Sequence, residues 1–215
     1  MTQTLILFDL DGTLTDSGEG IIHSAAYALR RFNIAETDSD RLKRFVGPPL
    51  KNSFMDFYGL DENQAEQAVF YYREYFTDRG IRENRLYSGV EEMLRRCLDT
   101  GKTLALATSK PIVFAQRILE DFGLSHYFAY TCGSNLDGTR CAKAEVVAQV
   151  LADAGAAASD AVMVGDRKHD LIGAKECGLF AIGVSYGYGS RQELIEYGAD
   201  AIADSVEDLT ALLCG

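Results

Sequence analysis

Two acidic residues, Asp9 and Asp11, stand one residue apart in the string Asp9-Leu10-Asp11-Gly12-Thr13. Side chains alternate along an extended chain, so both carboxylates are expected to lie on the same side and close together. Such a pair persists when a cation neutralises it or when one carboxylate holds a proton, which predicts a metal site or acid/base chemistry. An Asp-Gly turn with two solvated acids is the alternative interpretation. A calcium loop is excluded, because Leu14 stands where that loop needs glycine.

A second pair of acids, Asp166 and Asp170, follows the apolar run 162–164. With Asp166 at the end of a strand and Asp170 on the first turn of the next helix, both side chains would face one site. Carboxylate oxygens without a cluster of Cys or His favour Mg²⁺ over Zn²⁺. Surface acids at a helix N-terminus are the alternative interpretation of Asp170.

Two further side chains suit an anionic ligand. Thr108 follows the apolar run 103–107, and a hydroxyl there, beside the N–H groups of the next helix, suits a phosphoryl oxygen. The alternative is a helix N-cap with Pro111 opening the helix. Lys143 begins a helical pattern, where the helix dipole disfavours a cation, so we expect it to neutralise a bound phosphate. A solvated surface lysine is the alternative.

The elements that must position these residues are short apolar runs separated by helical patterns. Such runs are typical of strands buried on both faces of a parallel sheet. Strands that alternate with helices predict an α/β fold, a doubly wound, Rossmann-like parallel sheet with right-handed crossovers. The strands are expected at residues 4–8, 103–107, 161–164 and 179–184, and on weaker patterns at 127–131 and 199–203.

One region, residues 18–82, shows helical patterns only. Asp61 is a plausible N-cap for one of its helices. The sequence therefore predicts a smaller all-helical cap, residues 18–82, inserted after the first strand of an α/β catalytic core formed by residues 1–17 and 83–215. A helical insert at this place is expected to act as a lid. A helical layer packed rigidly on the sheet is the alternative.

Composition limits the partners. The chain of 215 residues is 47% hydrophobic and 25% charged, as in an average globular protein. A net charge of −11 argues against nucleic-acid polymers and anionic membranes as partners, which leaves a small molecule. No run of about 18 apolar residues predicts a membrane-spanning helix. The five cysteines include no Cys-x-x-Cys pair and are expected to be thiols in a reducing cytoplasm.

The motifs together resemble those of a known family. Asp9-x-Asp11-Gly-Thr, Thr108, Lys143 and Gly165-Asp166-x-x-x-Asp170, in this order, are similar to the four motifs of the haloacid-dehalogenase superfamily. The helical insert resembles the helical, C1-type cap of that superfamily. The segment 45–50, Phe-Val-Gly-Pro-Pro-Leu, is similar to its phosphoglycolate-phosphatase-like branch. In this family the first strand lies at the centre of the sheet.

The resemblance implies a phosphatase that uses Mg²⁺ and an aspartyl-phosphate intermediate. Asp9 would be the nucleophile and Asp11 the general acid and base. Mg²⁺ would be held by Asp9, the backbone carbonyl of Asp11, Asp166 and Asp170. Thr108 and Lys143 would bind the phosphoryl oxygens, and further substrate-binding positions are expected at Gly12, Thr13, Ser109 and, in the insert, Lys51.

The substrate is expected to be a small phosphorylated metabolite, either phosphoglycolate-like or a nucleoside 5'-monophosphate. Ser109 stands where many phosphoglycolate phosphatases have Asn, and Ala144 stands where many relatives have Pro. These differences count against phosphoglycolate and leave nucleoside monophosphates and other small phosphomonoesters open. Lys51 has a second interpretation, as an exposed helix charge.

Two other functions remain open at this point. A sugar phosphomutase would share every motif and would convert a hexose phosphate into an isomer instead of releasing phosphate. A non-enzymatic phospho-aspartate switch would also combine Mg²⁺, an aspartate and a lysine on a parallel sheet. Asp11 argues against the switch, because an acid two residues past the nucleophile shortens the life of an acyl phosphate.

Overall fold

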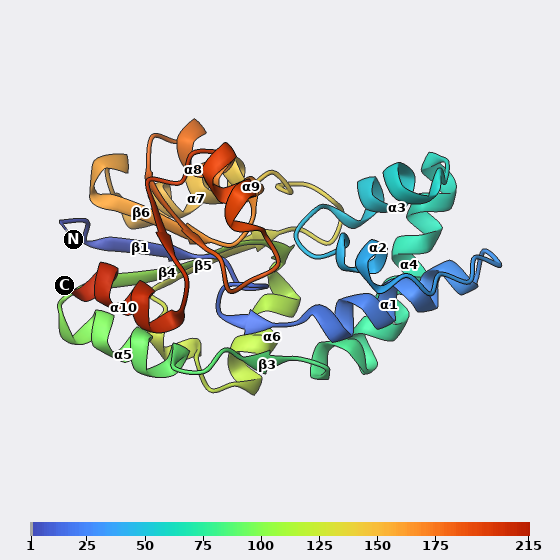
Figure 1. Cartoon of the computed structure of the whole chain (residues 1–215), viewed down its shortest axis with the longest axis horizontal. Coiled ribbons are helices and arrows are strands. Elements are labelled where there is room, and N and C mark those ends of the chain that lie inside the picture. Colours follow the sequence, from blue (N-terminus) through green and yellow to red (C-terminus); the bar gives the residue numbers. More distant parts are fainter. Residues whose placement is uncertain (1) are drawn as a thin grey trace. The chain divides into compact units, whose positions relative to one another are not determined.

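The computed structural model describes residues 2–215, which form two compact units. One unit comprises the residues up to Thr15 together with Leu86–Gly215, and the other comprises Asp16–Arg85. Figure 1 gives the element labels used below.

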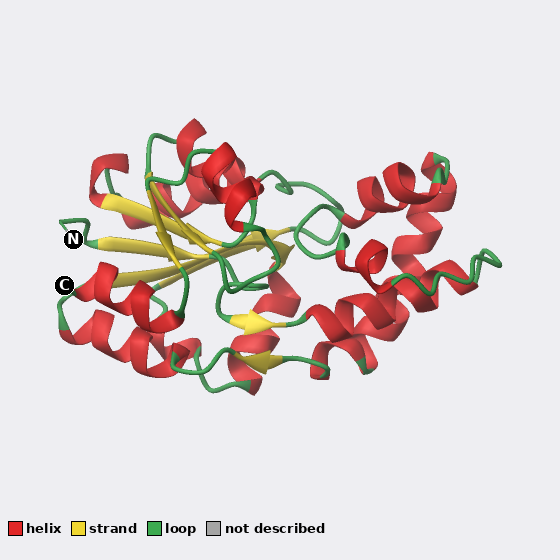
Figure 2. Ribbon diagram, viewed as in Figure 1, coloured by secondary structure: helices red, strands yellow, loops and turns green. Residues whose placement is uncertain are grey.

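The first unit contains a six-stranded parallel sheet in the order β5-β4-β1-β6-β7-β8. The first strand, β1, is therefore central and doubly flanked, as predicted. Phe8 lies opposite Leu106 on one side and Val164 on the other, so the carboxyl ends of β1, β4 and β6 meet at one edge (Figure 2). The strands are β1 (Leu5–Phe8), β4 (Thr103–Pro111), β5 (Tyr130–Ser134), β6 (Ala161–Gly165), β7 (Phe180–Val184) and β8 (Ala201–Ala203).

Helices cover both faces of this sheet. Figure 1 shows α7 (Lys143–Ala154) and α8 (Lys168–Glu176) on one side, with α5 (Val90–Asp99) and α10 (Val206–Cys214) on the other. The remaining helices of the unit are α6 (Ile112–Asp121), α9 (Arg191–Glu196) and the short 3₁₀ turns η2 (Ser125–Tyr127) and η3 (Ala158–Asp160). Leu7, Met163, Val147 and Leu171 belong to the core cluster beneath α7 and α8. Successive side chains of β1 point to opposite faces of the sheet, and all four are buried.

The second unit is helical. It contains α1 (Gly18–Arg30), α2 (Ser39–Lys43), α3 (Leu50–Tyr58), α4 (Glu62–Asp78) and the 3₁₀ turn η1 (Gly80–Arg82). Asp61 caps α4 as predicted: its carboxylate accepts from the N–H of Gln64, and the Gln64 side chain accepts from the N–H of Asp61. Ile21 and Leu29 of α1 and Phe76 of α4 are buried, so the apolar faces seen in the sequence form the interior of this unit.

The main differences from the sequence prediction concern strands. A two-stranded sheet, β2 (Thr15–Asp16) with β3 (Arg85–Leu86), was not predicted, because two-residue strands leave no periodicity to detect. The strand expected at 103–107 continues to Pro111, and β5 begins three residues later than expected. The strand was predicted to begin at residue 127 because Tyr127 and Phe128 are aromatic residues typical of strands. They are buried, but in the 3₁₀ turn and the residue after it.

Among residues 2–215, no helix combines the length and the apolar character that a membrane crossing requires.

Candidate active site

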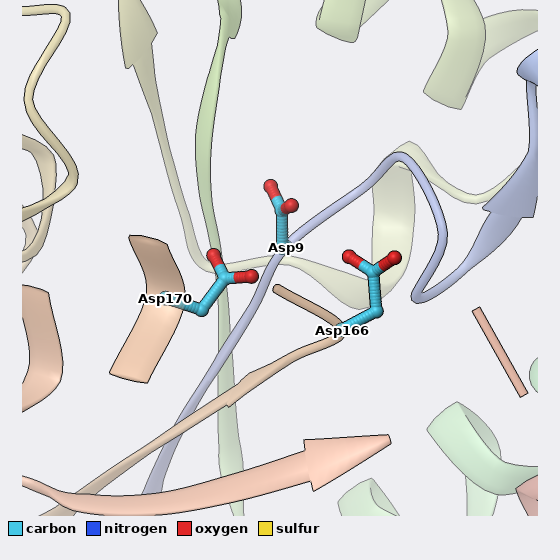
Figure 3. Close-up of side chains that lie close together, drawn as sticks. All are labelled: Asp9, Asp166 and Asp170. Carbon is cyan, nitrogen blue, oxygen red and sulfur yellow. The ribbon is translucent and has the colours of Figure 1, made fainter. Parts of the chain in front are cut away.

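Three carboxylates converge at the carboxyl edge of the sheet (Figure 3). Asp9 follows β1 and Asp166 follows β6, while Asp170 is the third residue of α8. One oxygen of each lies within 4.8 Å of the others. Oδ2 of Asp170 accepts the N–H of Arg167 at 3.1 Å and so caps α8, which holds this carboxyl group in place and leaves Oδ1 for the cluster.

The three acids are buried: 7% of Asp9 is exposed and almost nothing of Asp166 and Asp170. Burial, reinforced by the charge of Asp170, raises the pKa of Asp9 to about 6, although Lys143 opposes the shift. Burial and the charges of Asp170 and Asp9 also raise the pKa of Asp166 well above its ordinary value. The alternative of solvated acids in an Asp-Gly turn is therefore wrong for Asp9, and the alternative of surface acids is wrong for Asp170.

The donor set fits a hard divalent cation. Oδ1 of Asp166 is buried without a hydrogen-bond partner among the described residues, while Oδ1 of Asp9 and of Asp170 share a single cation, Nζ of Lys143. Buried carboxylates at such separation repel one another unless a cation lies between them. Oxygen-only donors of this kind suit Mg²⁺.

Lys143 is the first residue of α7 and is buried. Its Nζ lies 2.8 Å from Oδ1 of Asp9 and 2.8 Å from Oδ1 of Asp170, and it donates a hydrogen bond to the Ala107 carbonyl at 2.9 Å. Burial alone would lower the pKa of Lys143, but the two carboxylates outweigh it and raise the pKa. The lysine is thus a fixed cation at the site, and the solvated-lysine alternative is wrong.

Thr108 and Ser109 lie in β4, beside the end of β1. The Thr108 hydroxyl is buried and accepts the N–H of Lys110 at 3.2 Å. It does not cap α6: Pro111 is the N-cap residue there, and no side chain accepts from the first turn. The N-cap interpretation of Thr108 is therefore wrong, while Ser109 is half-buried on the same segment.

The structure separates Asp11 from the three-carboxylate cluster. Both oxygens of its carboxylate contact Nζ of Lys110, at 3.1 and 2.8 Å. Gly12 follows with a φ of 81°, and a Cβ there would lie 2.1 Å from Oδ2 of Asp166, so only glycine permits this approach. The hydroxyl of Thr13 is buried without a hydrogen-bond partner, and its carbonyl accepts from the Tyr186 hydroxyl.

Sequence reasoning missed a loop that supports Asp166. The loop 185–190 joins β7 to α9, and the N–H of Tyr188 donates to Oδ2 of Asp166 at 2.7 Å. A Cβ on Gly187 would lie 2.3 Å from the Gly12 carbonyl, and one on Gly189 would lie 1.9 Å from the Asp166 carbonyl. The Gly187-Tyr188-Gly189 string is thus a close-packed support for the site. Two glycines two residues apart were its only sequence signal.

Lys51 belongs to the helical unit. Its Nζ lies 2.8 Å from Oε1 of Glu62 and 2.8 Å from Oε1 of Glu66, both on α4. These contacts match the interpretation of an exposed helix charge, and a role in substrate binding stays a prediction.

The fold and the site together define a Rossmann-like α/β protein with a buried cluster of three carboxylates where its first strand ends. Residues 6–184 match the model of the haloacid dehalogenase-like hydrolase family. The chain belongs to this family and is a hydrolase, as its four motifs indicated.

The chain is similar to proteins with different names at several levels of sequence identity. A 5'-nucleotidase from Pseudomonas aeruginosa is 50% identical over 88% of this chain and 86% of its own length. The tyrosine-protein kinase PtkA of Mycobacterium tuberculosis is 40% identical over 89% of this chain and 65% of its own length. A phosphoglycolate phosphatase from Vibrio parahaemolyticus is 29% identical over 97% of this chain and 96% of its own.

A predicted phosphatase from Clostridium acetobutylicum, whose crystal structure is known, is 46% identical in sequence to this chain. It superposes with a TM-score of 0.96 over 99% of both chains. The predicted fold class is thereby confirmed.

Proposed function

We propose that the protein is a magnesium-dependent phosphatase that hydrolyses a small phosphomonoester through an aspartyl-phosphate on Asp9. One observation carries this proposal: Asp9 lies in a buried three-carboxylate cluster and is paired with the buried Lys143. A carboxylate beside a cation site and a fixed ammonium suits attack on an anionic phosphate.

The residues that would hold Mg²⁺ are Asp9, Asp166 and Asp170, with the backbone carbonyl of Asp11. When bound, the ion would neutralise charge on the phosphate and on the attacking carboxylate. Asp166 is oriented for this by the N–H of Tyr188, and Asp170 by the N–H of Arg167.

In the first step, a carboxylate oxygen of Asp9 forms a bond to phosphorus as the bond to the leaving oxygen breaks. Asp11 gives that oxygen a proton and the alcohol departs. In the second step, Asp11 takes a proton from a water molecule whose oxygen attacks phosphorus, which releases phosphate and restores Asp9. Lys143 and Thr108, with Ser109 and the Gly12-Thr13 backbone, would hold the non-reacting phosphoryl oxygens.

We propose a nucleoside 5'-monophosphate as the substrate in preference to phosphoglycolate. The relative named 5'-nucleotidase is 50% identical, whereas the phosphoglycolate phosphatase is 29% identical. A net charge of −11 suits a small substrate gathered by a local site more than a nucleic-acid polymer. We further propose that the helical unit acts as a lid with Lys51 among its substrate contacts, and that the enzyme works in the cytoplasm.

Phosphate release from a panel of metabolite phosphates tests this function. Nucleoside 5'-monophosphates are expected to give a kcat/KM at least about 10-fold above that of phosphoglycolate, because a larger leaving group offers more transition-state contacts. A panel in which phosphoglycolate leads would reverse the substrate assignment. Isomerisation of a hexose phosphate, or a phosphorylated protein that persists for hours, would replace the phosphatase by the mutase or the switch.

Gly187→Ala is expected to raise the Mg²⁺ concentration for half-maximal phosphate release about 10- to 100-fold, as loss of a ligand's support commonly does. The added methyl group would lie 2.5 Å from Cβ of Asp166 and would displace that ligand. Gly155→Ala is the control: a Cβ there meets nothing within 4 Å, and its φ of 59° makes the change cost about 1 kcal/mol of stability only. An unchanged Mg²⁺ requirement in Gly187→Ala would contradict the supporting role of the loop.

A further inference from the structure

We propose that Lys110 is a positioning residue that fixes the carboxylate of Asp11 for proton transfer, and that a bulge in β4 directs the Lys110 side chain toward Asp11. This inference rests on the proposed function, in which Asp11 serves both steps. It assigns a role to a lysine that none of the four family motifs includes.

The bulge is visible in the pairing of β4 with β5. Ala107 lies opposite Cys132 and Pro111 lies opposite Ser134, so four steps along β4 match two steps along β5. Two extra residues are therefore accommodated between Ala107 and Pro111. Bulges of this kind redirect side chains and are frequent beside active sites. Lys110 lies within this segment.

Two contacts define the path of the bulge. The N–H of Lys110 donates to the hydroxyl of Thr108 at 3.2 Å, inside the bulge itself. On the neighbouring strand, a Cβ on Gly133 would lie 2.6 Å from the carbonyl oxygen of Lys110 and 3.1 Å from Cα of Ile112. Glycine at position 133 therefore lets the bulged backbone of β4 press against β5.

The bulge directs Lys110 to Asp11. Nζ lies 3.1 and 2.8 Å from the two carboxylate oxygens, and only 7% of the lysine side chain and 12% of the aspartate side chain are exposed. A charge-assisted contact to both oxygens in so little solvent fixes the orientation of the carboxyl group.

The two acids of the first motif thus have different cations. Lys143 contacts Asp9 and Asp170, within the cluster that would hold Mg²⁺, whereas Lys110 contacts Asp11, whose carboxylate is not part of that cluster. The contact of Nζ with both oxygens restricts rotation of the Asp11 carboxylate. Held by Lys110, it stays available to the leaving oxygen and to the attacking water.

Leaving-group dependence distinguishes this role from a merely structural one. The p-nitrophenolate anion leaves without a proton, whereas an alkoxide needs one, and kcat/KM reports the steps through departure of the leaving group. Lys110→Met is expected to lower kcat/KM for glycerol 2-phosphate about 10- to 100-fold more than for p-nitrophenyl phosphate, part of the effect of a general acid. Lys110→Arg is expected to recover part of that difference.

Two further variants complete the test. Gly133→Ala displaces the bulge, which also carries Thr108 and Ser109, so it is expected to slow both esters and, if Lys110 acts through its position, to slow glycerol 2-phosphate more than p-nitrophenyl phosphate. Lys102→Met is the matched control, because Nζ of Lys102 donates to the Gln3 carbonyl at the opposite end of the strand and should have no selective effect. Thermal melting establishes that each variant is folded, and Gly133→Ala and Lys110→Arg keep the test decisive if Lys110→Met does not fold.

The outcomes separate this inference from the proposed function. Equal losses with both esters in Lys110→Met, or no loss, would overturn the role of Lys110 while Asp11→Asn still shows the selective loss. An Asp11→Asn variant without selectivity would overturn the acid/base role of Asp11 in the proposed function, and this inference with it. A greater loss of kcat/KM for glycerol 2-phosphate in Lys110→Met and Gly133→Ala, absent from Lys102→Met, supports the positioning role of Lys110.

Discussion

Asp9→Asn is expected to lower phosphate release by on the order of 10⁴- to 10⁶-fold, as removal of a nucleophile does in other hydrolases. An amide nitrogen or oxygen is a poor nucleophile toward phosphorus, so the first step of the proposed mechanism is lost with the Asp9 carboxylate. The fold should persist, because Asn has nearly the same volume and Lys143 keeps its contact with Asp170. Steady-state phosphate release and thermal melting measure the two quantities.

The matched control for this variant is Asp99→Asn, the same change at an exposed residue of α5 that pairs with Arg95. It should retain full activity. Mass spectrometry of acid-quenched wild type with substrate should also find phosphate on Asp9 and none in Asp9→Asn. Residual activity above about 1% in Asp9→Asn, well outside the range for a lost nucleophile, would place the transferred phosphoryl group elsewhere.

Asp166→Asn is expected to abolish the response to Mg²⁺ and at the same time to stabilise the metal-free protein. Chelation of divalent ions should silence the wild type, and Mg²⁺ should restore its activity and raise its melting temperature through binding to the folded state. In Asp166→Asn both responses should be absent. The metal-free variant should melt higher than the metal-free wild type, by about 2 to 4 °C for each kcal/mol of repulsion removed.

The pH dependence of that difference has a definite sign. The pKa of Asp9 rises from 3.8 to about 6 in the folded protein, and burial also raises the pKa of Asp166 well above its ordinary value. Acids with raised pKa values stabilise the folded state fully at low pH and lose that contribution as the pH rises through the folded-state value. The advantage of Asp166→Asn should therefore be larger at pH 8 than at pH 5 in the absence of metal. A variant that melts lower than the wild type at pH 8 would contradict the repulsion.

The sequence predicted those parts of the site that depend on local order. Asp9 and Asp166 directly follow apolar strands, and Asp170 lies one helical turn past Asp166, so strand and helix geometry alone bring them to one edge. Lys143 was singled out because a cation at a helix N-terminus needs a partner, and the structure supplies Asp9 and Asp170. In each case a regular element carries the residue to its place.

The parts that were not predicted depend on contacts between distant segments. The bulge that aims Lys110 arises from the register of β4 against β5, and register is invisible in either strand alone. Gly187 and Gly189 are required by Gly12 and Asp166, more than 20 residues before them, so their string reads only as a turn. The β2–β3 pair joins two-residue segments about 70 positions apart, too short for any periodic pattern.

The double contact of Lys143 also bears on charge balance during turnover. In the proposed aspartyl-phosphate, the Asp9 oxygen bonded to phosphorus no longer carries a full negative charge, and the phosphoryl oxygens that Lys143 would bind carry negative charge in its place. A buried ammonium needs a counterion throughout this exchange. Oδ1 of Asp170, 2.8 Å from Nζ and outside the reacting bonds of the proposed mechanism, provides one before, during and after the covalent step.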